Sequence, residues 1–151
     1  MEKPFVLVAD DNEATCTLIT ALLQHEFAVD IVTDGAEALE KLKSRQYAAI
    51  LLDLLMPMVD GYAVLDAIRV QRPDLLRRTL VVTASLSMRT TERLRQYDIC
   101  GLVAKPFEVD ALLAAVRQCA GEGSGSTVRG PLLSSGMILL LGELLRTKWV
   151  P

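Results

Sequence analysis

Polar side chains that can bind a metal ion or a phosphate follow four short apolar runs of this sequence. Asp10 and Asp11 follow the first of these runs, and Asp53, Thr83 and Lys105 each follow another. Such runs are typical of strands buried in a parallel sheet, and the carboxyl ends of parallel strands share one edge, where ligands bind. We therefore expect acids, a hydroxyl and an amine to converge there.

The acids in this set suit phosphoryl transfer. A carboxylate such as Asp53 can attack a phosphoryl group and hold it as an acyl phosphate. Both reactants are negative, so the reaction needs positioning and neutralisation, which a hard divalent cation can supply. Mg²⁺ prefers oxygen ligands and retains some waters. The expected ligands are Asp11 and Asp53 directly, Asp10 through water, and the backbone carbonyl of Leu55.

The remaining polar groups suit the phosphoryl oxygens. Lys105 provides a point charge, and the Thr83 hydroxyl and the backbone amides near Ala84 can donate hydrogen bonds. Each residue alone has an ordinary structural explanation: Asp10 and Asp11 could cap a helix, and Thr83 is common at strand ends. Their joint occurrence favours the hypothesis of a magnesium-assisted phosphoryl acceptor.

The elements that position these residues alternate along the chain. Apolar runs rich in Val, Ile and Leu are separated by helical patterns, which predicts repeated βα units on a parallel sheet, with helices on both faces. In the first helix, Leu18, Ala21, Leu22 and Leu23 are expected to face the core. The expected strands are 5–9, 29–32, 48–52, 80–83 and 102–104, and the expected helices are 12–25, 35–45, 61–71, 88–97 and 108–119.

Composition limits the classes of protein that fit. A chain of 151 residues suits one domain. A net charge of -3 and a pI near 5.2 disfavour direct binding to nucleic acid or to an anionic membrane. The N-terminus leaves no room for a signal peptide before the first strand, and the spacing of Cys16, Cys100 and Cys119 favours reduced, buried thiols. We therefore expect a cytoplasmic protein.

The composition changes after the last expected helix. We expect the domain to cover 1–120, a Gly- and Ser-rich linker to cover 121–136, and a short apolar segment to cover 137–151. This segment is too short for a membrane span of about 20 residues. If helical, it could dock on the domain, on a partner or on a second copy in a homodimer. The alternative is a disordered tail or a remnant of a longer chain.

In its motifs and their order, residues 3–119 resemble a response-regulator receiver domain of two-component signal transduction. The resemblance implies a flavodoxin-like (βα)5 doubly wound fold with strand order 2-1-3-4-5. It also implies a Mg²⁺-dependent phosphoryl transfer to Asp53 from a histidine kinase or a histidine phosphotransfer protein, without enzymatic turnover. The motifs are Asp10-Asp11, Asp53-x-x-Met56-Pro57-x-x-Asp60-Gly61, Thr83-Ala84 and Lys105-Pro106-Phe107.

The family resemblance also implies a switch, and the sequence departs from the family there. Phosphorylation would draw the Thr83 hydroxyl inward and change the face formed by the fourth helix, fifth strand and fifth helix. The position usually held by Tyr or Phe, three before Lys105, is Leu102, which has no ring to reorient. Leu55, two residues after the acceptor, is apolar and orients no water, which predicts slow loss of the phosphoryl group. The Lys105-Pro106 bond is expected to be cis.

Three other classes of protein are alternatives. A pseudo-receiver that only binds partners would be expected to lack Asp53, Lys105 or one of the paired acids. A haloacid-dehalogenase-type phosphatase needs a second acid where Leu55 stands. An FMN-binding flavodoxin is disfavoured because the acids after the first strand would repel phosphate. His25, the only histidine, lies at an expected helix end, so the phosphodonor is expected to be another molecule.

Overall fold

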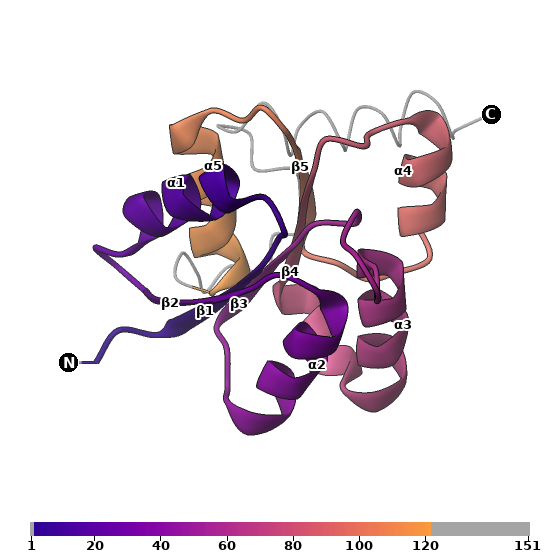
Figure 1. The fold of residues 1–151 in the computed structure, drawn as a ribbon, viewed down its shortest axis with the longest axis horizontal. Coiled ribbons are helices and arrows are strands. Elements are labelled where there is room, and N and C mark those ends of the chain that lie inside the picture. The colour runs from indigo at the N-terminus through magenta and orange to yellow at the C-terminus, as the bar shows by residue number, and fades with distance from the viewer. Residues whose placement is uncertain (1, 122–151) are drawn as a thin grey trace.

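The computed structural model describes residues 2–121 and contains one sheet of five strands. All neighbouring strands are parallel, and their order is β2-β1-β3-β4-β5 (Figure 1). This is the flavodoxin-like order that the family resemblance implied, with β2 at one edge. The strands are β1 (Phe5–Ala9), β2 (Ala28–Val32), β3 (Ala49–Leu52), β4 (Thr79–Thr83) and β5 (Gly101–Ala104).

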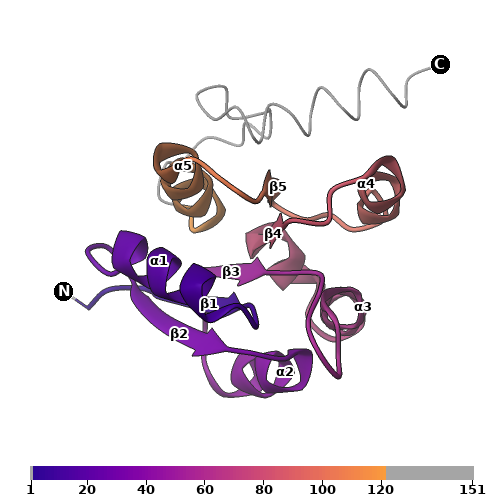
Figure 2. The same cartoon turned by 45° about the horizontal axis from the view of Figure 1, so that its top comes forward.

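Helices cover both faces of this sheet, as right-handed crossovers require. Figure 2 shows α1 and α5 on one face and α2, α3 and α4 on the other. Several helices begin at a residue whose side chain accepts a hydrogen bond from an amide of the first turn, namely Asn12, Asp34, Asp60 and Ser87. The helices are α1 (Glu13–Leu23), α2 (Gly35–Ser44), α3 (Gly61–Gln71), the 3-10 helix η1 (Pro73–Arg78), α4 (Met88–Leu94) and α5 (Val109–Cys119).

The core consists of two apolar layers separated by the sheet. Alternate residues of β1 point to opposite faces: Leu7 belongs to the layer under α2 and α3, and Val8 belongs to the layer under α1 and α5. The β3 strand is buried along its whole length. Because both faces of the central strands are covered, their sequences are continuously apolar rather than alternating.

The inward face of α1 differs from the predicted one. Cys16, Ile19 and Leu23 are buried, at spacings of three and four residues, whereas Leu18 is 46% exposed and Ala21 is also exposed. The prediction was wrong for Leu18 and Ala21 because it was based on which residues are apolar. The buried face instead follows the helical spacing that starts at Cys16. Cys16 is itself an apolar member of that stripe.

Two segments next to α3 and α4 also differ from expectation. η1 was not predicted; it starts with Pro73, whose fixed φ suits the first position of a helical turn. The α4 helix ends at Leu94 rather than near 97. Tyr97 lies beyond that end, is buried, and donates its hydroxyl to Asp66 of α3 at 2.5 Å. The chain therefore leaves the helix early and packs Tyr97 against its neighbour.

The expectation of three reduced cysteines was wrong for two of them. Cys100 and Cys119 form a disulfide, with their Cα atoms 5.7 Å apart. They are 19 residues apart in sequence, but the topology returns the end of α5 to the start of β5, where the two side chains meet. Cys16 is a free, buried thiol, as expected. The cysteines therefore no longer support a cytoplasmic location.

Among residues 2–121, no helix is both long and apolar enough to cross a membrane. The predicted linker beyond 121 and the predicted apolar segment 137–151 lie outside the described residues.

Candidate functional site

The sheet places four of the predicted residues through backbone hydrogen bonds that continue past the strand ends. The amide of Asp10 donates to a carbonyl of β2 at 3.0 Å, and the amide of Asp53 donates to a carbonyl of β1 at 3.0 Å. The amide of Lys105 donates to the carbonyl of Thr83 at 2.9 Å. The residues that follow β1, β3 and β5 are thereby fixed at the carboxyl edge of the sheet.

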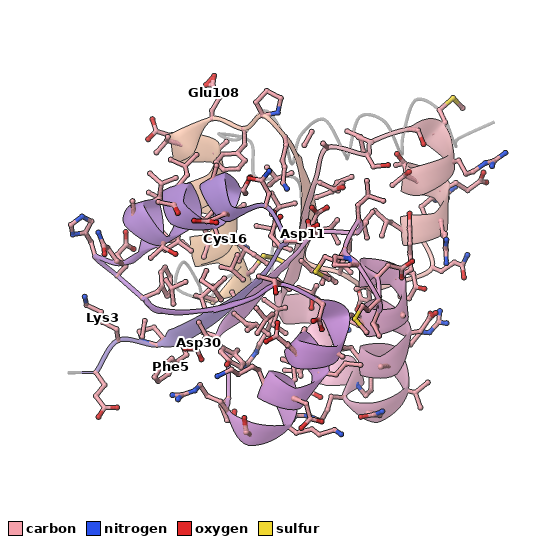
Figure 3. All side chains as sticks on the ribbon, viewed as in Figure 1. Lys3, Phe5, Asp11, Cys16, Asp30 and Glu108 are labelled. Carbon is pink, nitrogen blue, oxygen red and sulfur yellow. A yellow bond between two sulfur atoms is a disulfide. The ribbon has the colours of Figure 1, made fainter. Side chains whose placement is uncertain are left out.

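Three carboxylates meet at this edge. Asp10, Asp11 and Asp53 each offer an oxygen within 4.8 Å of the others. Asp10 and Asp53 are 2% and 7% exposed, whereas Asp11, labelled in Figure 3, is exposed. The Asn12 amide donates to Asp10 Oδ1 at 2.8 Å, and the Leu55 amide donates to Asp53 Oδ1 at 3.3 Å. These backbone donors orient the two buried carboxylates.

Lys105 lies between the two buried acids. Its Nζ donates to Asp10 Oδ2 at 2.6 Å and to Asp53 Oδ2 at 3.1 Å. Burial disfavours the charged ammonium, but the hydrogen bonds and the negative charges of both carboxylates outweigh it and raise the pKa of Lys105. The peptide bond from Lys105 to Pro106 is cis, as the family resemblance implied. One ammonium against three carboxylates leaves two negative charges uncompensated, which suits a divalent cation.

Thr83 and Ala84 lie beside Lys105 at the end of β4. The Thr83 side chain is completely buried, and its hydroxyl oxygen accepts a hydrogen bond from the Ser85 amide at 3.1 Å. Ala84 is exposed and carries no bulky side chain. The Thr83 hydroxyl therefore interacts with the loop that leads to α4, while its carbonyl holds the backbone of Lys105.

Gly61 allows the loop after β3 to fold back onto Asp53. A Cβ atom at this position would lie 2.4 Å from the carbonyl oxygen of Asp53 and 2.6 Å from the Cα of Leu54. The Gly61 amide donates to the Leu54 carbonyl at 3.0 Å. In the sequence, Gly61 was recognised only as part of a motif. An Asp-Gly pair predicts a turn, but it does not predict this close contact between two backbone segments.

Cys16 is a second residue whose contact with the site was missed. Its Sγ donates a hydrogen bond to the Asp10 carbonyl at 3.2 Å. Burial and the negative charge of Asp10 raise the pKa of Cys16 to about 11, so the side chain is a neutral thiol that can donate. No sequence signal distinguishes this contact from ordinary core packing.

Leu102 is buried in the same apolar layer as Leu94 and Tyr97. The aromatic contacts of this region lie instead between α3 and α4. The Arg93 guanidinium carbon lies 3.6 Å from the centre of the Tyr62 ring, and the Tyr97 hydroxyl donates to Asp66. The contacts of this region therefore join α3 to the segment of α4, and β5 contributes no aromatic ring to them because Leu102 stands at the position usually held by Tyr or Phe.

These features define a receiver domain, and comparison with known proteins agrees. The family model described as "Response regulator receiver domain" matches residues 6–117. The chain therefore belongs to the receiver-domain family of two-component response regulators.

Curated relatives support this assignment. "Response regulator ArlR" of Staphylococcus saprophyticus is 32% identical over 113 residues, which cover 74% of this chain and 50% of that protein. "Transcriptional regulatory protein TcrA" of Mycobacterium tuberculosis is 31% identical, over 89% of this chain and 52% of that protein. "Probable transcriptional regulator ycf29" of Porphyra purpurea is 28% identical, over 78% and 56%. The chain spans about half the length of these relatives.

Solved structures show the same fold. The receiver domain of sensor histidine kinase PA1611 from Pseudomonas aeruginosa, solved with a magnesium ion coordinated in its active-site cleft, is 29% identical with a TM-score of 0.71. The match covers 79% of this chain and 98% of that one. The receiver domain of the Francisella response regulator 1452 is 26% identical, also with a TM-score of 0.71, over 78% and 97%.

Proposed function

We propose that this protein is a phosphorylatable receiver in which Asp53 accepts a phosphoryl group in a Mg²⁺-dependent reaction. One observation carries the proposal: Asp10, Asp11 and Asp53 gather within 4.8 Å at the edge of the sheet, with the Lys105 ammonium bound to two of them. A purely structural ion pair needs one acid per amine. The surplus negative charge supports a role for this cluster in binding a cation.

The donor set fits magnesium. Asp11, Asp53 and the Leu55 carbonyl are the proposed ligands, with Asp10 acting through water, and oxygen ligands of this kind are those that Mg²⁺ prefers. When bound, the cation would neutralise charge on the phosphoryl oxygens. The PA1611 receiver, which has a magnesium ion in the corresponding kind of cleft, supports this assignment by similarity.

The side chains of this chain have distinct proposed roles in the transfer. A carboxylate oxygen of Asp53 attacks phosphorus, and the bond from phosphorus to the donor breaks, with its electron pair leaving on the donor. Lys105 is already held at this carboxylate by its contact with Asp10, so its charge is available to a phosphoryl oxygen. Thr83 and the amide near Ala84 would donate to the remaining oxygens.

The similarity to the receiver family supports a proposed phosphodonor and a proposed output surface. A histidine kinase or a histidine phosphotransfer protein in the cytoplasm would supply the phosphoryl group. The signal would leave through the α4–β5–α5 face, because the Thr83 hydroxyl interacts with the loop before α4 and would exchange that contact for the phosphoryl group. Leu102 is buried and has no ring, so it would move in response to the change at Thr83 and would not cause that change.

The test is intact mass spectrometry after incubation with acetyl phosphate, with and without Mg²⁺. We expect one phosphoryl adduct that requires Mg²⁺ and is absent in Asp53→Asn. Asp60→Asn is the matched control, because it changes an aspartate of the same loop while asparagine still caps α3. A protein that gains no adduct under any condition would instead be a pseudo-receiver that works by binding partners.

A further inference from the structure

The disulfide lies at the end of the sheet opposite the acidic cluster. Cys100 directly precedes β5, and Cys119 is the last residue of α5. Lys105 follows the other end of β5, and α5 runs back along the strand from that end (Figure 1). The disulfide thus closes the β5–α5 unit at the edge remote from Asp53.

The two sulfur atoms differ in burial. Cys119 is 5% exposed, whereas Cys100 is only partly buried, so an external thiol meets Cys100 first. The remaining cysteine, Cys16, is buried, and its Sγ is held at the Asp10 carbonyl, at the opposite end of the sheet. Because disulfide exchange needs an attacking sulfur that reaches one of the two bonded sulfur atoms, Cys16 is a poor internal competitor. Opening of the Cys100–Cys119 bond therefore depends on a thiol from outside the domain.

We propose that Cys100 and Cys119 form a reversible redox clamp, which fixes the last turn of α5 to the start of β5 and is opened by a cellular dithiol. This inference rests on the proposed function, because a receiver that is phosphorylated in the cytoplasm works in a compartment where persistent disulfides are rare. Those that do form there in mesophiles usually sense or catalyse redox change.

The exchange balances as two successive displacements. A thiolate of the dithiol attacks Sγ of Cys100, the bond to Cys119 breaks, and Cys119 leaves as a thiolate that takes up a proton. The second thiol of the reductant then attacks the mixed disulfide, and Cys100 leaves and is protonated in turn. The protein gains two electrons and two protons, and the dithiol becomes a disulfide.

Other contacts keep α5 attached when the clamp is open. Leu112 and Ala115 lie in the turns before the last one, are fully buried, and belong to the apolar layer on this face of the sheet. The first turn of α5 follows the Lys105 loop, far from the disulfide. Reduction should therefore loosen only the last turn of α5, which belongs to the proposed output face, and leave the phosphoacceptor site unchanged.

The first test is a redox titration of the full chain in glutathione buffers, read by alkylation and intact mass. We expect two thiols to appear together and reversibly at an intermediate ratio of reduced to oxidised glutathione. Cys16 should be alkylated only after denaturation. A pair that stays oxidised across the whole series would be a purely structural disulfide, and one that stays reduced would be no clamp; either result overturns the proposal.

The second test is hydrogen exchange of the amides of residues 116–119. Reduction should raise their exchange rates by about tenfold and lower Tm by roughly 10 °C. Cys100→Ser and Cys119→Ser should have the exchange rates and the Tm of the reduced protein, and adding reductant should change neither. Cys16→Ala should still respond to the reductant as the wild type does. Exchange rates that do not change on reduction would overturn the clamp. Neither readout requires phosphorylation, so failure of Asp53 to accept a phosphoryl group is distinguished from failure of the clamp.

Discussion

The two carboxylate oxygens of Asp53 have different surroundings. Oδ2 accepts a charged hydrogen bond from Lys105 at 3.1 Å, whereas Oδ1 accepts only a long one, at 3.3 Å, from the Leu55 amide. Charged hydrogen bonds are the stronger kind, so Oδ1 is the less tightly held oxygen. On the proposed function, Oδ1 is the oxygen better suited to attack phosphorus.

The Leu55 side chain should control how long the phosphoryl group survives. It is 60% exposed beside the acceptor and has no polar atom to orient water. In Leu55→Asn, an amide could position a water for attack, and we expect hydrolysis to be faster by about tenfold. Loss of the adduct is followed by intact mass after removal of the donor.

Met58→Asn is the matched control for this prediction. Met58 lies in the same loop, is 89% exposed and has a positive φ of 64°, a conformation that asparagine tolerates. We expect its phosphoryl lifetime to equal that of the wild type. Equal lifetimes for Leu55→Asn and the wild type would contradict the role of Leu55.

Gly61 should be intolerant of any side chain. In Gly61→Ala the new Cβ would meet the Asp53 carbonyl oxygen at 2.4 Å, so the loop must move. We expect a loss of about 1–3 kcal/mol in the free energy of unfolding, together with a lower adduct yield. Ala63→Gly, at an exposed position of the same helix, should cost about 1 kcal/mol and leave the yield unchanged. Urea unfolding and intact mass measure the two effects.

At the scale of elements, the turn that follows α4 is held by side-chain contacts with α3. The Tyr97 hydroxyl donates to Asp66, and burial followed by this hydrogen bond raises the pKa of Tyr97 to about 12. Tyr97→Phe removes the hydroxyl and leaves the Asp66 carboxylate with its Arg69 ion pair. We expect a loss of about 1 kcal/mol in the free energy of unfolding, measured with urea.

The same contact predicts a dependence on alkaline pH. A pKa raised from 10 in the folded state means that Tyr97 contributes stability fully below pH 10 and loses it as the pH rises towards 12. The difference in stability between wild type and Tyr97→Phe should therefore shrink over that window. A difference that stays constant between pH 9 and 12 would contradict the raised pKa.

Elements with strong local signals were predicted closely, and elements decided by tertiary packing were not. The α3 helix matches its predicted bounds, because Asp60 caps it and Pro73 follows it. The end of α4 was missed because the burial of Tyr97 against α3 decides it. The local sequence pattern gives no information about packing against a helix that lies more than 20 residues away in the sequence.

At the scale of the whole molecule, the strand order followed from the motifs, whereas the disulfide did not. Each βα unit has its own pattern, and the family resemblance supplied the order of the strands. The Cys100–Cys119 pair depends on how far α5 runs back along β5, which is a property of the folded chain. The contacts of Gly61 and Cys16 with the site were missed for the same reason.

The site and both core layers lie within residues 2–121. We therefore propose that this part of the chain folds and accepts a phosphoryl group without the rest. A chain truncated after Gly121 should keep its Mg²⁺-dependent adduct and its Tm to within about 3 °C, because it retains every core residue that the structure describes. Thermal unfolding and intact mass measure both; loss of cooperative unfolding would show that the domain needs the removed residues.

The most direct measurement of the central claim identifies the residue that carries the phosphoryl group. An acyl phosphate is reduced by borohydride to an alcohol, so the modified aspartate becomes homoserine and can be located by peptide mass spectrometry. After phosphorylation with acetyl phosphate and Mg²⁺, we predict homoserine at position 53 alone. Homoserine at position 10 or 11, or an adduct that resists borohydride, would contradict the assignment of Asp53 as the acceptor.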